Sequence, residues 1–195
     1  MLRLDRTFLF FWHNILRMNL IENLIKEIES HNLWDRKIDL NRNEYLKVKG
    51  SIDTNLYFIL SGSLRMFIID EYEEHTIRFG YSKNLIAALD SYLSEKPSDL
   101  YIQAIKRTEL KVISKKRFAA LLANSDDLKS AWLLILEELI VQQMEREIDI
   151  LTSSPIERYR RVLKRSPRLF QEIPNKYIAS YLRMSPETLS RIKKY

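Results

Sequence analysis

Short apolar segments separated by turn residues fill the middle of the chain, from about residue 38 to residue 114. The stretches with strand-like patterning are 44–49, 55–60, 63–70, 75–79, 100–105 and 110–114. Ser61-Gly62 lies between two of them and predicts a tight corner, because glycine adopts a positive φ without steric cost. Strands that are this short and this regularly spaced predict a small antiparallel barrel or roll.

Helical patterns flank this β-rich region on both sides. Residues 19–29 place apolar side chains on one face, and residues 115–123 form a second, shorter amphipathic segment. The apolar run 8–12 is too short to span a membrane, and no small-residue cleavage site follows it. We therefore expect residues 1–17 to be an extension outside the fold, and 18–125 to form the roll with its flanking helices.

A long helix follows the roll. Residues 127–151 contain neither glycine nor proline, so a helix over them has a length of ~40 Å. Its first half is apolar almost all round, which either buries it inside one large domain or requires a second partner. The later half narrows to a seam with heptad spacing, which favours a homodimer built on a helix over 126–152. The residues predicted for this dimer helix are Trp132, Leu134, Val141, Met144, Ile148 and Leu151.

The last part of the chain, 153–195, predicts several short helices. Ser154 and Pro155 form a helix start, and Ser166-Pro167 begins another short helix. Residues 173–195 then predict two short helices with a tight joint, in which the second helix begins at the N-cap Ser185. The apolar residues that pack the two helices together are Ile178, Leu182, Met184, Leu189 and Ile192. A short helix held in this way has the size to enter a DNA major groove.

The positive charge of the chain is concentrated in this last part. From Ser153 onward there are eleven basic and three acidic residues, against 21 basic and 23 acidic residues in the remainder. The whole positive excess of +6 therefore comes from the segment that carries the helical hairpin. Such a distribution favours phosphate binding over the alternative, a surface hairpin whose charges are merely solvated.

Composition argues against several classes of function. The chain has no cysteine, its three histidines are scattered, and only three glycines are present. These counts leave no disulfide, thiolate metal site or cysteine nucleophile, and no histidine cluster or glycine-rich phosphate loop is seen. We expect a cytoplasmic protein that is not an enzyme, needs no cofactor or metal and does not insert into a membrane.

The order of roll, long helix and helix-turn-helix resembles the Crp-Fnr family of bacterial transcription regulators, particularly its Bacteroidetes-type members. The residues that carry the resemblance are Leu56–Arg65, Tyr177–Leu182 and Ser185–Arg191, and the likeness extends over about 19–195. It implies an α+β fold: an antiparallel β-roll (cyclic-nucleotide-binding-like) with a long dimerisation helix and a small all-α helix-turn-helix domain. The implied function is a homodimeric, sequence-specific DNA-binding regulator, with double-stranded DNA, a second copy and RNA polymerase as partners.

The effector cassette of the nucleotide-binding members is missing. In those members a Gly-Glu pair holds the ribose and a later Arg-Ser or Arg-Thr pair holds the cyclic phosphate. The corresponding positions here are Ala87-Ala88 and Ser98-Asp99. Alanine cannot bond a ribose hydroxyl, and a carboxylate repels a phosphate. We therefore expect no tight binding of cyclic AMP or cyclic GMP. The alternative function is a small-molecule-sensing or scaffold dimer that retains a degenerate hairpin.

The resemblance and the residue chemistry together suggest roles within the hairpin. Arg183 occupies the joint where many such units have glycine, at a cost of about 1 kcal/mol. Pro186 stands where well-studied relatives have a base-reading arginine, which leaves Arg191 for guanine and Glu187 for a cytosine amine. Glu187 alternatively serves the dipole of the helix. The residues predicted for phosphate contacts and register are Lys176, Tyr177, Ser185, Thr188, Ser190, Lys193 and Lys194.

Overall fold

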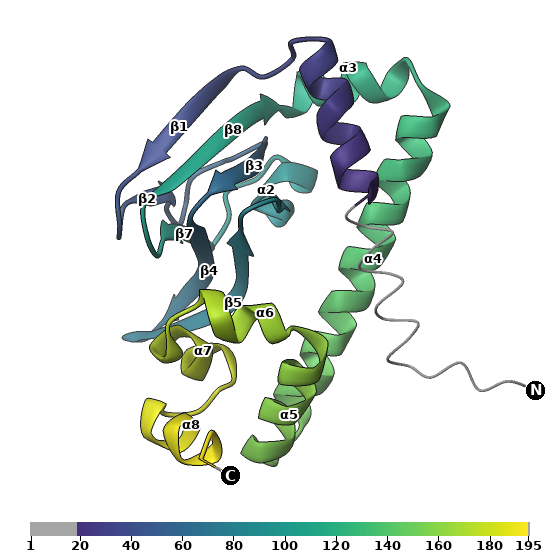
Figure 1. Cartoon of the computed structure of the whole chain (residues 1–195). Coiled ribbons are helices and arrows are strands. Elements are labelled where there is room, and N and C mark those ends of the chain that lie inside the picture. The colour runs from purple at the N-terminus through teal and green to yellow at the C-terminus, as the bar shows by residue number, and fades with distance from the viewer. Residues whose placement is uncertain (1–18, 195) are drawn as a thin grey trace, which may run out of the picture. The chain divides into compact units, whose positions relative to one another are not determined.

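The computed structural model describes residues 19–194, which form two compact units (Figure 1). One unit comprises residues 19–34 and 116–148. The other comprises residues 35–115 and 149–194. The extension expected over residues 1–17 lies outside the described residues.

The second unit contains the predicted β-roll, made of two four-stranded antiparallel sheets. The first sheet has, in spatial order, β1 (Arg36–Leu40), β8 (Thr108–Ser114), β3 (Asn55–Ser61) and β6 (Leu85–Ile86). The second has, in the same way, β2 (Tyr45–Lys47), β7 (Tyr101–Ala104), β4 (Ser63–Asp70) and β5 (Glu73–Tyr81). The predicted antiparallel roll is confirmed, with the corner at Gly62 at φ +92°.

The core of the roll lies between its two sheets. On β4, Leu64 and Met66 point inward, beside Ile102 of the same sheet, and share one buried cluster with Ile59 and Leu110 of the facing sheet. Because successive side chains of a strand alternate in direction, the intervening Arg65 and Phe67 lie on the outer face of the same sheet. They too are buried, so this sheet is covered on both faces.

Three short elements of the roll were not predicted from the sequence. β1 is mostly polar because only part of it faces the core, and it is held by pairing with β8, where Ile38 lies opposite Leu110. β6 has only two residues, and the helix α2 (Leu89–Ser94) has six, which is too short for helical periodicity to be visible. Pairing and packing with distant residues create these elements.

The helices agree closely with the predicted ranges. Residues 19–30 form an N-terminal helix, followed after the roll by α3 (Lys115–Ala123) and the uninterrupted α4 (Asp126–Leu151). The C-terminal helices are α5 (Pro155–Arg165), α6 (Pro167–Glu172), α7 (Asn175–Tyr181) and α8 (Pro186–Ile192). Among the residues that the structure describes, no helix has both the length and the apolar character needed to cross a membrane.

The two positive-φ glycines give a matched test of the roll corner. A Cβ at Gly62 would collide with the Arg107 carbonyl and the Thr108 hydroxyl, whereas a Cβ at Gly50 (φ +82°) meets no atom within 4 Å. We expect Gly62→Ala to lower the free energy of unfolding by ~2–4 kcal/mol, because strain and overpacking add. Gly50→Ala should cost only ~1 kcal/mol from strain. Urea denaturation of both variants measures the difference, and equal losses would contradict the assigned collision.

Candidate nucleic-acid interface

The predicted helical hairpin is formed by α7, a tight turn and α8. Ser185 caps α8 by accepting a hydrogen bond from the Thr188 backbone N–H at 3.2 Å, and Pro186 occupies the first turn. Arg183 has the predicted positive φ, at 55°. The following Met184 N–H then donates to the Ala179 carbonyl at 3.1 Å, which closes the end of α7.

An apolar core fixes the angle between the two helices. Ile178, Ala179 and Leu182 of the first helix and turn are fully buried together with Leu189 of α8. Met184 packs at the edge of this cluster, as the sequence predicts. Because both helices have only seven residues, this packing and not intrinsic helix propensity holds α8 in place.

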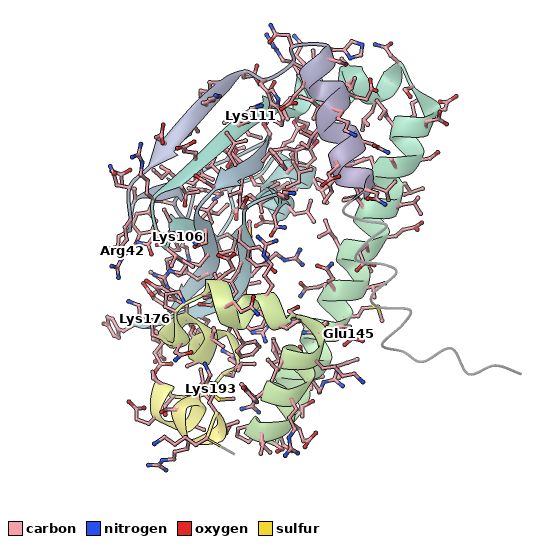
Figure 2. The ribbon with its side chains drawn as sticks, viewed as in Figure 1. Arg42, Lys106, Lys111, Glu145, Lys176 and Lys193 are labelled. Carbon is pink, nitrogen blue, oxygen red and sulfur yellow. The ribbon has the colours of Figure 1, made fainter. Side chains whose placement is uncertain are left out.

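The outer side of the hairpin presents most of the residues predicted to contact DNA. Thr188 is half-buried beside the helix cap. Lys193 donates to the Asn175 side chain at 2.9 Å, which brings the end of α8 to the start of α7 (Figure 2). The exposed members of the predicted set are Lys176, Ser185, Glu187, Ser190, Arg191, Lys193 and Lys194.

Glu187 is positioned to serve its own helix. Its backbone N–H is the main cause of a lowered pKa of its carboxyl group, followed by a hydrogen bond from Ser185 and by the charge of Arg191. The carboxylate is therefore ionised at neutral pH, in the first turn of α8, where negative charge is favourable. This geometry fits the interaction with the helix dipole, and it leaves the carboxylate exposed, so that a DNA base can still reach it.

Tyr177 does not lie where a phosphate contact would require. Its side chain is buried within the same cluster as the hairpin core. The Arg65 guanidinium of β4 lies 4.5 Å from the ring centroid, and the Lys176 ammonium lies at the same distance. Since the ring anchors α7 against the roll, Tyr177 is a positioning residue in this structure.

The docking of α7 on the roll was missed in the sequence. The Ser180 hydroxyl donates to the Glu74 carbonyl at 2.8 Å and accepts from the Thr76 backbone N–H at 3.1 Å. Nearby, the Phe79 and Tyr181 rings lie 5.5 Å apart. More than one hundred residues separate the partners of these hydrogen bonds. No local pattern in the sequence indicates such a contact.

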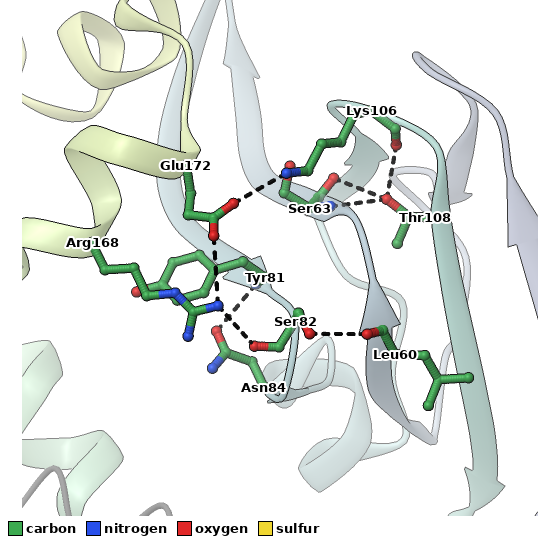
Figure 3. Close-up of polar contacts among 9 residues, drawn as sticks. All are labelled: Leu60, Ser63, Tyr81, Ser82, Asn84, Lys106, Thr108, Arg168 and Glu172. Atoms are coloured by element: carbon green, nitrogen blue, oxygen red, sulfur yellow. Dashed lines mark hydrogen bonds and ion pairs between the residues drawn. The ribbon is translucent and has the colours of Figure 1, made fainter.

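Charged contacts join α6 to loops of the roll (Figure 3). The Glu172 carboxylate lies between the Lys106 ammonium at 3.1 Å and the Arg168 guanidinium at 3.6 Å. The hydrogen bond from Lys106 is the largest cause of the lowered pKa of the Glu172 carboxyl. Arg168 also donates to the Ser82 carbonyl at 3.3 Å and covers the Tyr81 ring at 4.5 Å. These arginine and lysine side chains therefore have structural partners.

Arg158 links the segment after α4 to the turn of the hairpin. Its buried guanidinium donates to the carbonyls of Thr152 and Ser153, at 2.6 and 3.1 Å. On its other side it donates to the carbonyls of Leu182 and Arg183, at 2.9 and 3.2 Å. One guanidinium thus binds four carbonyls from two distant segments, which fixes the hairpin turn relative to the segment between α4 and α5.

Asp149 makes a second link at the end of α4. Its fully buried carboxylate pairs with Arg161 at 2.9 Å and with Arg165, both on α5. A buried carboxylate requires such pairing, because an isolated buried charge is very costly. Together with the contacts of Arg158, these ion pairs join residues 149–153 to α5 within the second unit.

The four positions that the family resemblance aligns with the effector cassette have structural roles. Ala88 is fully buried in the roll core, directly before α2. The Ser98 hydroxyl accepts from the Leu100 backbone N–H at 3.0 Å, and the exposed Asp99 carboxylate pairs with Lys49 at 3.0 Å. Ala87 is half-buried. Neither alanine offers a polar side chain, and Asp99 brings negative charge to this region.

Polar groups near this region of the roll bond to one another. The Asp53 carboxylate accepts from the Tyr57 hydroxyl at 2.9 Å and from Asn55. Burial is the main cause of a raised pKa of the Tyr57 hydroxyl. The buried Lys47 ammonium donates to two backbone carbonyls, and the loss of hydration lowers its pKa. These groups therefore already have partners within the chain.

The apolar seam predicted on α4 is exposed, with one correction. Leu134, Val141, Met144, Ile148 and Leu151 are between 44% and 77% exposed. Trp132 instead makes an edge-to-face contact with Phe118 of α3, with ring centroids 4.9 Å apart. It lies on the side of α4 that packs within its own chain, because its position falls outside the heptad spacing of the other five.

Arg158 and its neighbour Arg160 provide a matched pair of variants. Arg158→Met removes the donors of four carbonyls, so we expect a loss of ~2–4 kcal/mol in the free energy of unfolding. Arg160→Met removes only an exposed pair with Glu157 and should change stability by less than ~0.5 kcal/mol. Denaturation measures both, and hydrogen exchange should accelerate at 152–154 and 182–185 in Arg158→Met alone. Unchanged exchange in both segments would contradict the proposed link.

Comparison with known proteins agrees with the fold. Residues 37–125 match the family model of the cyclic nucleotide-binding domain. No curated protein sequence gives a significant match to the chain. Similar solved structures include FixK2 from Bradyrhizobium japonicum, at 16% identity and a TM-score of 0.68, with 82% of each chain covered.

Two further structures cover even more of the chain. A cyclic nucleotide-binding domain containing protein from Listeria monocytogenes EGD-e has 14% identity and a TM-score of 0.67, covering 90% of this chain and 87% of its own. The c-di-GMP responsive global regulator CLP from Xanthomonas campestris has 14% identity and a TM-score of 0.64, covering 89% and 90%. Residues 37–125 are therefore similar to the cyclic nucleotide-binding domain, and the chain shares the fold of these three solved structures.

Proposed function

We propose that this protein is a homodimeric, sequence-specific DNA-binding regulator of transcription. The observation that carries the proposal is the basic, exposed outer side of α8, a helix fixed by its own N-cap and by a buried hairpin core. A rigid short helix with exposed cations at one end of a basic domain fits the major groove of duplex DNA. The fold shared with Crp/Fnr-family regulators supports the same function.

Within the hairpin, Arg191 is the residue assigned to base recognition. It is exposed on α8, and an arginine can donate two hydrogen bonds to the O6 and N7 atoms of guanine. The exposed Glu187 is available to accept from a cytosine amine. Lys176 and Lys193, at the start of α7 and the end of α8, are assigned to the phosphate backbone (Figure 2).

Two copies of the chain are needed to read a near-palindromic site. The exposed seam of α4 supplies an apolar surface for a second copy. Paired α4 helices would carry two hairpins to successive major grooves, which lie about 34 Å apart along the duplex. Contact with RNA polymerase, implied by the family resemblance, is part of the same proposal.

Cyclic AMP is not the effector in this proposal. The ribose and phosphate positions are occupied by alanines, by a serine that bonds the backbone and by a carboxylate paired with Lys49. The nearby buried polar groups already have partners inside the chain. A cyclic phosphate would therefore lose hydration without gaining a cationic partner.

Arg191→Ala and Lys193→Ala should change DNA binding in different ways: the first its sequence specificity, the second its overall affinity. Arg191→Ala should lose discrimination at one base pair, worth ~1–3 kcal/mol, because only a base contact depends on sequence. Lys193→Ala should weaken all DNA sequences alike and reduce the salt slope by about one. Fluorescence anisotropy with a selected site, its single-base variants and random duplex measures both effects over a salt series. Equal losses for Arg191→Ala on specific and random DNA would refute its role in base recognition.

Titration with cyclic AMP tests the effector assignment. We expect no measurable heat in isothermal titration calorimetry at physiological salt, and no change in DNA affinity when the nucleotide is added. The physical reason is the absence of a cation for the phosphate and of a carboxylate for the ribose at the cassette positions. Binding of micromolar affinity or tighter would overturn this part of the proposal.

A further inference from the structure

One charged residue lies in the middle of the exposed apolar stripe of α4. An α-helix turns ~100° per residue, so the exposed apolar residues of α4, apart from Ile150, fall within an arc of ~120°. These residues are Leu133, Leu134, Ile140, Val141, Met144, Ile148 and Leu151. By the same geometry, Glu137 lies close to the centre of the arc, and its side chain is exposed.

Glu137 differs from its neighbour Glu138 in having no partner within the described part of the chain. Glu138 is buried and accepts a hydrogen bond from Gln142 at 3.1 Å. Among the described residues, none donates a hydrogen bond to Glu137 or forms an ion pair with it. Its neighbours at three and four residues along the helix are Leu133, Leu134, Ile140 and Val141, which are all apolar. The stripe therefore carries a carboxyl group that has no partner among the residues that the structure describes.

The spacing of the stripe points to a second copy of the chain as its occupant. Leu134, Val141 and Ile148 recur every seven residues and take the a positions of a heptad repeat. Met144 and Leu151 take the d positions, and Glu137 takes the d position before them. In parallel coiled coils, β-branched residues at a positions such as Val141 and Ile148 favour two strands, and each core residue then meets the same residue of the second copy. In such a pair the two Glu137 carboxylates face each other.

We propose that Glu137 weakens the self-association of α4, so that two copies pair reversibly and more tightly at higher ionic strength. The inference rests on the proposed homodimer. Two like charges in a partly dehydrated seam repel each other, and dissolved ions screen this repulsion. Pairing then becomes most favourable where two copies are already held close together, as on the two halves of one DNA site.

Self-association of the full chain tests this role. Sedimentation equilibrium would compare the wild type with Glu137→Gln and Glu137→Leu. Because Gln removes the charge and keeps the size, we expect about tenfold tighter association in Glu137→Gln, and more in Glu137→Leu. Glu147→Gln is the control: Glu147 is exposed at the border of the stripe, so removing its charge should change the dissociation constant by less than about twofold.

Ionic strength provides a second measurement on the same proteins. Raising sodium chloride from about 50 mM to about 500 mM should tighten the wild-type dimer more than the Glu137→Gln dimer, because only the wild type carries the screened repulsion. The same salt response in both proteins, or association of Glu137→Gln no tighter than wild type, would overturn the role of Glu137.

Val141→Glu separates this inference from the proposed homodimer. A second charge on the stripe should leave the chain monomeric if α4 is the interface. If Val141→Glu associates like the wild type, or if neither the wild type nor Glu137→Leu associates at all, the α4 homodimer itself is wrong. If Val141→Glu is monomeric and Glu137→Gln is no tighter than wild type, only the role of Glu137 fails.

Discussion

The second unit depends on one sheet that is buried on both faces. β4 alternates Leu64 and Met66, which fill the roll, with Arg65 and Phe67 on its outer face, where Arg65 contacts Tyr177 of α7. The buried guanidinium of Arg65 is tolerated because Gln103 and Glu74 accept its hydrogen bonds and the Phe67 and Tyr177 rings cover it. Through this cluster the hairpin rests on the roll of its own chain, and the orientation of α8 in this unit depends on that contact.

Arginines are the main connectors of the C-terminal helices. Arg158 bridges the segment after α4 and the hairpin turn, while Arg161 and Arg165 share the buried Asp149. Arg168 donates a hydrogen bond to the Ser82 carbonyl of the roll. A planar guanidinium suits these tasks because it can donate to several carbonyls or carboxylates at once. Much of the positive charge that suggests nucleic-acid binding is therefore used inside the protein, and the exposed cations of α7 and α8 carry the proposed interface.

Local patterns in the sequence predicted the fold class and most of its elements correctly. The corner at Gly62, the uninterrupted α4 and the cap at Ser185 each follow from residues that are neighbours in the chain. Local patterns did not predict the elements and contacts that depend on residues far apart in the chain. β1 has a largely polar pattern and exists because β8 pairs with it. Tyr177 and Trp132 were assigned to surfaces, yet each is held by an aromatic or cationic partner that the periodicity does not reveal.

By itself, the sequence determined the class of elements, the position of the hairpin and the concentration of positive charge, because these depend on spacing, capping and composition. Tertiary structure alone decided which charges stay available to a partner, how α7 rests on the roll and that Arg158 binds the hairpin turn. Those features depend on contacts between residues far apart in the chain. The direction in which a side chain points is settled only when the backbone of both partners is in place.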